Sequence, residues 1–216
     1  MNKPSPWATI HREREALADD LMNLPLTSWT EPSLCSGWTV HQVLGHMVAT
    51  AKMTPVRFVT KLAASGFRFQ AMIARDLAAE TAGTPERTLA EFRAHAGDST
   101  GPPGPVESWL GETIVHSTDI RWPLGRDHEF PLDVVVRVAA FYSRSNALIG
   151  AKSRVSGIGL RATDTTWTTG TGPAVSGPIL ALVMAMTGRK AALPQLSGAG
   201  LDLLTARFDQ GAGAVS

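Results

Sequence analysis

Apolar side chains recur along the first half of the chain at the three- and four-residue steps that place them on one face of a helix. The first such stripe covers residues 7–24, and residues 25–38, with two prolines and a glycine, indicate an irregular connection. Because Gln42 follows Thr39 at the spacing of a capping box, Thr39 is expected to begin a second helix that continues toward Pro55. Further helices are predicted over 56–77 with a bend near 65–66, over 84–92, and over 106–122, where Pro123 stops the helix.

The second half of the chain begins with one more apolar helix and then changes character. Pro131 starts a helix that is expected to reach about residue 150. Residues 155–163 and 165–175 are rich in Thr, Val, Gly and Trp and indicate a β-hairpin, followed by an apolar helix over 179–186 and by a helix or a strand plus a helix over 196–208. We therefore predict a mainly α-helical protein, with a helical bundle over 1–150 and a small α+β extension over 151–216 that packs on it.

The composition excludes several classes of function. Of the 216 residues, 44% are hydrophobic and 18% are charged, which is typical of globular proteins. A net charge of +1 offers no field that would attract a nucleic acid or an anionic membrane surface. No secretory signal and no apolar stretch of the roughly 18 residues needed to span a bilayer are found, so a cytoplasmic protein is expected. The single cysteine, Cys35, has no cationic or cysteine neighbour in sequence and is interpreted as a packing residue.

Three residues have the chemistry of a metal site. Glu112 and His116 are four residues apart on a predicted helix, so both side chains project from one face of it. His46 stands in an apolar helix, where a buried imidazole needs a partner. A His, His, Glu set leaves an open coordination position in catalytic zinc sites. On spacing alone, however, the simpler alternatives are favoured: a core histidine bonded to a carbonyl, and a solvated Glu–His pair.

Three motifs together resemble a known family. They are SGWTVHQVLGHM at 36–47, GETIVHSTDIRWPLG at 111–125 and VSGPILALVMAMTGR at 175–189. In this order they resemble the DinB/YfiT-like metal-binding bundles, and within these the mycothiol-dependent maleylpyruvate isomerase family of actinobacteria. The resemblance implies a four-helix bundle in which His46, Glu112 and His116 hold a divalent metal, Zn²⁺ being the first choice and nickel, iron or manganese the alternatives.

The resemblance also implies mycothiol as a thiol co-substrate. A free thiol has a pKa of about 8.5, and coordination to a metal deprotonates it. The predicted function is therefore a metal-dependent thiol transferase or isomerase, in which the thiolate attacks a small electrophilic molecule. Isomerisation and conjugation differ only in whether the sulfur leaves again.

Three further residues are candidates for the surroundings of this site. A metal-ligating imidazole usually donates its second N–H to a carboxylate or carbonyl, and Asp119 near His116 and Gln42 near His46 are candidates for this role. The alternatives are a solvated helix-end aspartate and a plain capping glutamine. Arg189 is a candidate for binding an anionic group of the substrate or thiol, with a solvated arginine as the alternative.

Two other functions compete with thiol transfer. The first is a non-catalytic bundle that binds a small ligand or a metal and acts as a sensor or partner-binding protein. The second is a DNA-binding helix-turn-helix regulator, against which the weak net charge argues. We expect a monomer or a homodimer whose partners are small molecules.

Overall fold

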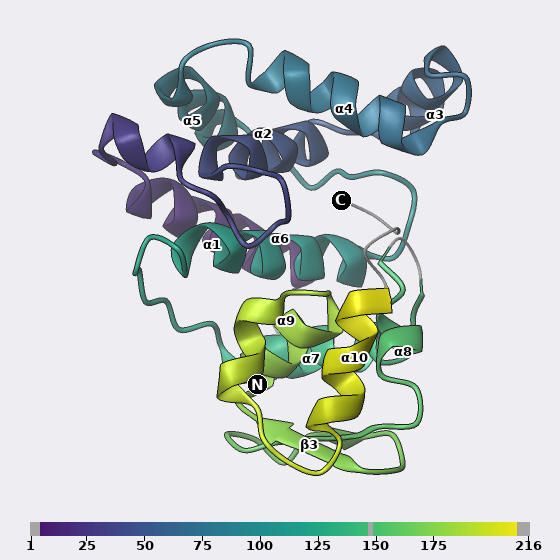
Figure 1. Cartoon of the computed structure of the whole chain (residues 1–216). Coiled ribbons are helices and arrows are strands. Elements are labelled where there is room, and N and C mark those ends of the chain that lie inside the picture. The colour runs from purple at the N-terminus through teal and green to yellow at the C-terminus, as the bar shows by residue number, and fades with distance from the viewer. Residues whose placement is uncertain (1–4, 147–148, 211–216) are drawn as a thin grey trace. The chain divides into compact units, whose positions relative to one another are not determined.

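The computed structural model describes residues 5–146 and 149–210 and forms two compact units, Met1–Asp127 and His128–Ser216 (Figure 1). The predicted fold class is confirmed, because helices dominate and a single small sheet accompanies them in the described residues. In sequence, the division between the units lies at 127/128, which is 23 residues before the boundary predicted at 150/151. The difference arises because the helix that follows Pro131 packs against a helix of the second unit.

Four helices of the first unit pack together as a bundle. Its members are α1 (Pro6–Asp20), α2 (Val40–Ala51), α5 (Pro85–Ala94) and α6 (Val106–Arg121). Helix α1 packs against α5 and α6, and α2 packs against the same two helices, so each helix has two neighbours in the bundle. A short 3₁₀ helix, η1 (Leu26–Thr30), lies in the connection between α1 and α2.

The start of α2 is fixed by the predicted capping box. The Gln42 backbone N–H donates to Thr39 Oγ1 at 3.3 Å, and Thr39 N–H donates to Gln42 Oε1 at 2.9 Å. These two bonds satisfy backbone donors that a helix start otherwise leaves free. The register of α2 is thereby set, and His46 lies in the middle of the helix.

The helical stretch predicted over 56–77 is interrupted near residues 65–66 as expected, but the interruption is a break between two separate helices and not a bend. These are α3 (Pro55–Ala64) and α4 (Phe69–Glu80), which pack against each other. Gly66 and Phe67 both have positive φ angles, 63° and 58°. Phe67 N–H donates to Leu62 O and Gly66 N–H donates to Ala63 O, the bond pattern of a Schellman motif that ends a helix.

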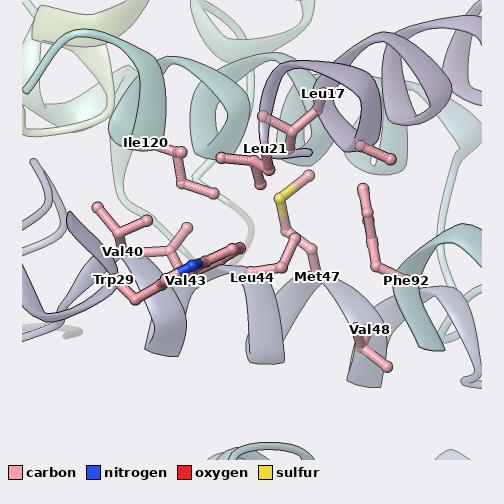
Figure 2. Packing of buried hydrophobic residues seen from close by; sticks show 11 residues of the cluster. Leu17, Leu21, Trp29, Val40, Val43, Leu44, Met47, Val48, Phe92 and Ile120 are labelled. Atoms are coloured by element: carbon pink, nitrogen blue, oxygen red, sulfur yellow. The ribbon is translucent and has the colours of Figure 1, made fainter. Parts of the chain in front are cut away.

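The core of the bundle is built mainly on α2 (Figure 2). Leu44 and Met47 point from α2 toward Leu17 and Leu21, and Phe92 of α5 and Ile120 of α6 add to the same cluster. All six side chains are almost completely buried. This packing holds α2 against the helices that carry the other predicted ligands.

The second unit combines four helical segments and a three-stranded sheet. The segments are α7 (Leu132–Tyr142), α8 (Ala151–Arg154), α9 (Ile179–Met186) and α10 (Leu201–Gln210), with a 3₁₀ helix η2 (Lys190–Gln195). Helix α7 ends before the expected residue 150, and residues 147–148 lie outside the described part of the chain. The sheet has the order β2-β1-β3.

The predicted β-hairpin is present, but its second arm is broken in two. Strand β1 (Gly159–Ala162) pairs antiparallel with β2 (Thr168–Thr169) and parallel with β3 (Ala174–Gly177). The break lies at Gly170–Pro173, where a Cβ on Gly170 or Gly172 would come within 2.2 Å of a backbone oxygen. Only glycine fits this close approach, and the proline that follows cannot donate to the ladder.

Within residues 5–146 and 149–210, no helix is both long enough and apolar enough to cross a membrane.

Replacing Leu44 by alanine tests the core of the bundle. Leu44 is 0% exposed, so the Leu44→Ala cavity is expected to lower the free energy of unfolding by about 2–5 kcal/mol. Urea denaturation followed by circular dichroism measures the change. Val56→Ala is the control, since Val56 is 73% exposed and its truncation should cost no more than about 0.5 kcal/mol. Equal losses in the two variants would contradict the packing described for α2.

Candidate metal centre

Helices α2 and α6 bring together the three residues that the sequence predicted as metal ligands. His46 comes from α2, and Glu112 and His116 come from α6, which packs against α2. One ligand atom from each residue lies within 4.8 Å of the other two. The two imidazole rings are 5.0 Å apart between centroids and meet edge to face at 78°. These residues are separated by up to 70 positions in sequence, and the packing of two helices makes them neighbours.

Glu112 supplies the strongest structural sign that a cation belongs here. Glu112 is partly buried, but its Oε1 is inaccessible to solvent and has no hydrogen-bond partner among the described residues. Burial raises the pKa of Glu112, while the charges of His116 and Arg14 and the hydroxyls of Thr50 and Thr113 act in the opposite direction. A buried carboxylate oxygen without a donor is costly, and a divalent cation would satisfy it. The donor set therefore fits a divalent metal.

His116 is oriented by a buried carboxylate on its own helix. Its Nδ1 lies 2.9 Å from Oδ2 of Asp119, three residues further along α6, and Asp119 is 0% exposed. This contact occupies Nδ1 and leaves Nε2 available as a metal ligand. The structure thus places Asp119 where the sequence analysis expected a residue that orients a ligating imidazole.

An aromatic ring covers His46. Trp38, in the segment just before α2, lies 5.2 Å from His46 between ring centroids. Trp38 is partly buried against the core cluster of the bundle. A large apolar ring beside the imidazole reduces the access of water to that side of the site.

The other two sequence-predicted residues have different surroundings. The side-chain oxygen of Gln42 accepts from the backbone N–H of Thr39, which is the capping alternative considered from the sequence. A role for Gln42 beside His46 stays a prediction. Arg189 belongs to the second unit, where its Nη1 donates to the carbonyl of Thr187 at 2.7 Å, just after α9. An anion-binding role for Arg189 also stays a prediction.

Three residues near the centre were missed by the sequence analysis. Thr50 lies one turn after His46 on α2, and its i+4 spacing was a usable signal. Arg14 interrupts the apolar stripe of α1 between Ile10 and Leu17, which was a second signal. Cys35 is in an irregular segment without periodicity, so no pattern could have indicated it.

Cys35 lies beside the site and was interpreted from the sequence only as packing. Its Sγ and ligand atoms of His116 and Asp119 lie within 4.8 Å of one another, so these residues form a second group that could hold an ion. The two groups share His116. The single cysteine of the chain is thus a neighbour of the candidate metal centre.

Comparisons with known proteins concern the family and the fold of the chain. Residues 10–101 match the family model described as the mycothiol maleylpyruvate isomerase N-terminal domain. Two solved structures of the mycothiol-dependent maleylpyruvate isomerase, one of them a histidine-to-alanine mutant, are similar in fold with a TM-score of 0.63. Each is 15% identical in sequence, and each alignment covers 90% of this chain and 91% of the other. A comparison with curated proteins found no match.

These matches bear on the resemblance seen in the sequence motifs. The matched segment begins within α1 and includes α2 to α5, and with α2 it includes His46. The similarity in fold extends over most of the chain. The matched family model and both solved structures carry the name of an isomerase, which agrees with the prediction of an enzyme. The resemblance predicted from the motifs agrees with these matches: residues 10–101 match the model of the mycothiol maleylpyruvate isomerase N-terminal domain, and the chain shares the fold of the maleylpyruvate isomerase.

Proposed function

We propose that this protein is a metal-dependent thiol transferase or isomerase, which uses His46, Glu112 and His116 to activate a low-molecular-weight thiol for attack on a small electrophile. The observation that carries the proposal is the convergence of these three ligand types around a buried carboxylate oxygen that has no other partner. The family match supports mycothiol as the thiol. Zinc is the proposed metal, because two imidazoles and a carboxylate suit it and leave a position open.

Each residue of the proposed site has a distinct role. When bound, a divalent metal supplies Lewis acidity, which converts a thiol with a pKa of about 8.5 into a thiolate at neutral pH. His46 and His116 provide neutral nitrogen donors, and Glu112 provides one negative charge. Asp119 holds the ring of His116 in place through Nδ1. Trp38 keeps water from one side of His46, which strengthens electrostatic interactions inside the site.

Both proposed reactions begin with the same bond. The sulfur electron pair forms a C–S bond to an electrophilic carbon of an alkene conjugated to a carbonyl, and the alkene electrons move onto the carbonyl oxygen. Rotation about the new single bond, return of these electrons and loss of the thiolate give an isomer. Protonation of the adjacent carbon before the sulfur leaves gives a conjugate instead. The chain would need to exclude a proton donor from that carbon to favour isomerisation.

A direct test uses the full chain loaded with Zn²⁺. The protein is incubated with mycothiol and a panel of unsaturated carbonyl compounds, and products are followed by mass spectrometry and by chromatography of geometric isomers. Adducts or isomers that require both metal and thiol support the proposal. Absence of either product with mycothiol, bacillithiol and glutathione would favour the alternative of a non-catalytic metal- or ligand-binding protein.

The cytoplasmic location and the state of monomer or homodimer expected from the sequence stay predictions.

Alanine substitutions of the ligands test the metal centre itself. We expect about one metal ion per chain in the native protein, and His46→Ala or His116→Ala should each lower metal affinity by at least about a hundredfold, since a three-ligand site loses one donor. Metal content by elemental analysis and chelator competition measure the effect. His11→Ala is the control, because His11 pairs with Ser99 away from the three ligands. Metal-free protein, or variants that retain the metal, would contradict the site.

Asparagine at position 119 tests how His116 is oriented. Asp119→Asn keeps the shape of the side chain but removes the charge that faces His116 Nδ1, so metal affinity should fall by about 10–100-fold. Isothermal titration with Zn²⁺ measures it. Asp98→Asn is a matched control, since Asp98 makes a similar contact with Nδ1 of His95, which is not among the three ligands. Equal affinities in the native protein and Asp119→Asn would refute the orienting role.

A further inference from the structure

Arg14 is a completely buried cation in the core of the bundle. It lies on α1, which packs against α6, and its exposed fraction is 0%. Arginine remains protonated in proteins, so its positive charge is carried into the interior. Fully buried arginines are uncommon unless a partner compensates the charge.

The compensation around Arg14 is incomplete. Nη1 reaches the carbonyl oxygen of Asp98 at the long distance of 3.4 Å. Nε and Nη2 are buried and lack a hydrogen-bond partner among the described residues. Arg121, the other large buried arginine of this unit, differs because its Nε and Nη2 both lie 2.6 Å from Oδ2 of Asp20. Arg14 therefore resembles a residue whose partner is missing rather than a core ion pair.

The charge of Arg14 interacts with the charge of Glu112, one of the three candidate ligands. Burial lowers the pKa of Arg14, and the negative charges of Glu112 and Asp98 act against this decrease. The positive charge of Arg14 in turn lowers the pKa of Glu112. Asp98 is itself engaged by the ring of His95 at 2.7 Å and is about half exposed, so its charge is partly screened. Glu112 lies on α6, against which α1 packs, and its Oε1 is buried, so its charge is the less screened of the two.

The charges of a bound divalent ion, the two carboxylates and Arg14 do not sum to zero. The carboxylates of Glu112 and Asp119 together neutralise a divalent ion, and the imidazoles that ligate it are neutral. Arg14 then adds one positive charge, which the half-exposed Asp98 compensates only in part. One monoanion in the open coordination position would make the site neutral, whereas a neutral ligand would not.

We propose that Arg14 is a fixed buried charge that makes the metal centre select monoanionic donors, a thiolate or a carboxylate, over neutral ones. The inference rests on the proposed metal site but not on thiol transfer. Arg14 is a positioning residue in this role, because it acts through the field at the metal and not by contact with the ligand. A Coulomb effect of this kind depends on charge and distance, so lysine should replace arginine in part.

The test compares an anionic with a neutral ligand on the same loaded protein. The full chain is loaded with Co²⁺ and titrated with acetate or with imidazole, and binding is followed in the visible absorption of the metal. Arg14→Met should lower the affinity for acetate roughly tenfold or more, as expected for unit charges several ångströms apart at an effective dielectric constant of about 20. The affinity for imidazole should not change. A third titration with 2-mercaptoethanol, followed by its sulfur-to-metal charge-transfer band, separates thiolate from carboxylate selection.

Two further variants exclude a merely structural role. Arg14→Lys keeps the charge and should retain most of the acetate affinity. Arg12→Met removes a charge from the same helix, but the Arg12 side chain is 53% exposed, so both affinities should stay at native values. If Arg14→Met does not fold, the polar neutral variant Arg14→Gln replaces it. Native acetate affinity in Arg14→Gln overturns the inference, and a selective loss that Arg14→Lys does not show supports it.

The outcomes also separate this inference from the proposed function. Equal losses for acetate and imidazole in Arg14→Met, or no loss for acetate, would overturn the role of Arg14 and leave the metal site intact. A native chain that binds no Co²⁺ or Zn²⁺ would overturn both. Selective loss of anion binding with native metal affinity supports the inference.

Discussion

The burial of one carboxylate oxygen, Oε1 of Glu112, is the constraint on which the candidate site of the first unit depends. Glu112 lies inside a four-helix bundle, and one of its oxygens has no hydrogen-bond partner among the described residues. An ionised carboxylate with a buried oxygen needs a nearby cation. Protonation of Glu112 would remove the negative charge that a metal ligand supplies. The two imidazoles within reach make a metal ion the cation that fits best. The core of α2 must therefore pack well enough to hold His46 against α6.

Much of this arrangement could be predicted because residues three or four positions apart on a helix project their side chains from the same face. The capping box at Thr39 and the end of α6 before Pro123 fixed both ligand-bearing helices, and the spacing of Glu112, His116 and Asp119 put three side chains on neighbouring turns of α6. The packing of α2 against α6 is a tertiary contact, which the spacing of residues within one helix does not predict. It entered the sequence analysis only through the resemblance of whole motifs.

What could not be predicted lies mostly where backbone conformation departs from periodic structure. The end of α3 depends on Gly66 and Phe67 with positive φ angles, and a sequence pattern shows only that a helix weakens there. The parallel pairing of β3 with β1 follows from close backbone approaches at Gly170 and Gly172, which no alternation of side chains encodes. Cys35 lies near the site because of the path of an irregular segment, which the sequence pattern also does not encode.

The contact between Asp119 and His116 decides which of the two overlapping ligand groups an ion would occupy. Both groups use His116, one with His46 and Glu112 and the other with Cys35 and Asp119. An ion bound by Asp119 would compete with the 2.9 Å contact that orients His116, and it would leave Oε1 of Glu112 buried without a partner. An ion bound by Glu112 preserves the first and satisfies the second. The thiol of Cys35 then stays within 4.8 Å of ligand atoms of His116 and Asp119 without binding the ion itself.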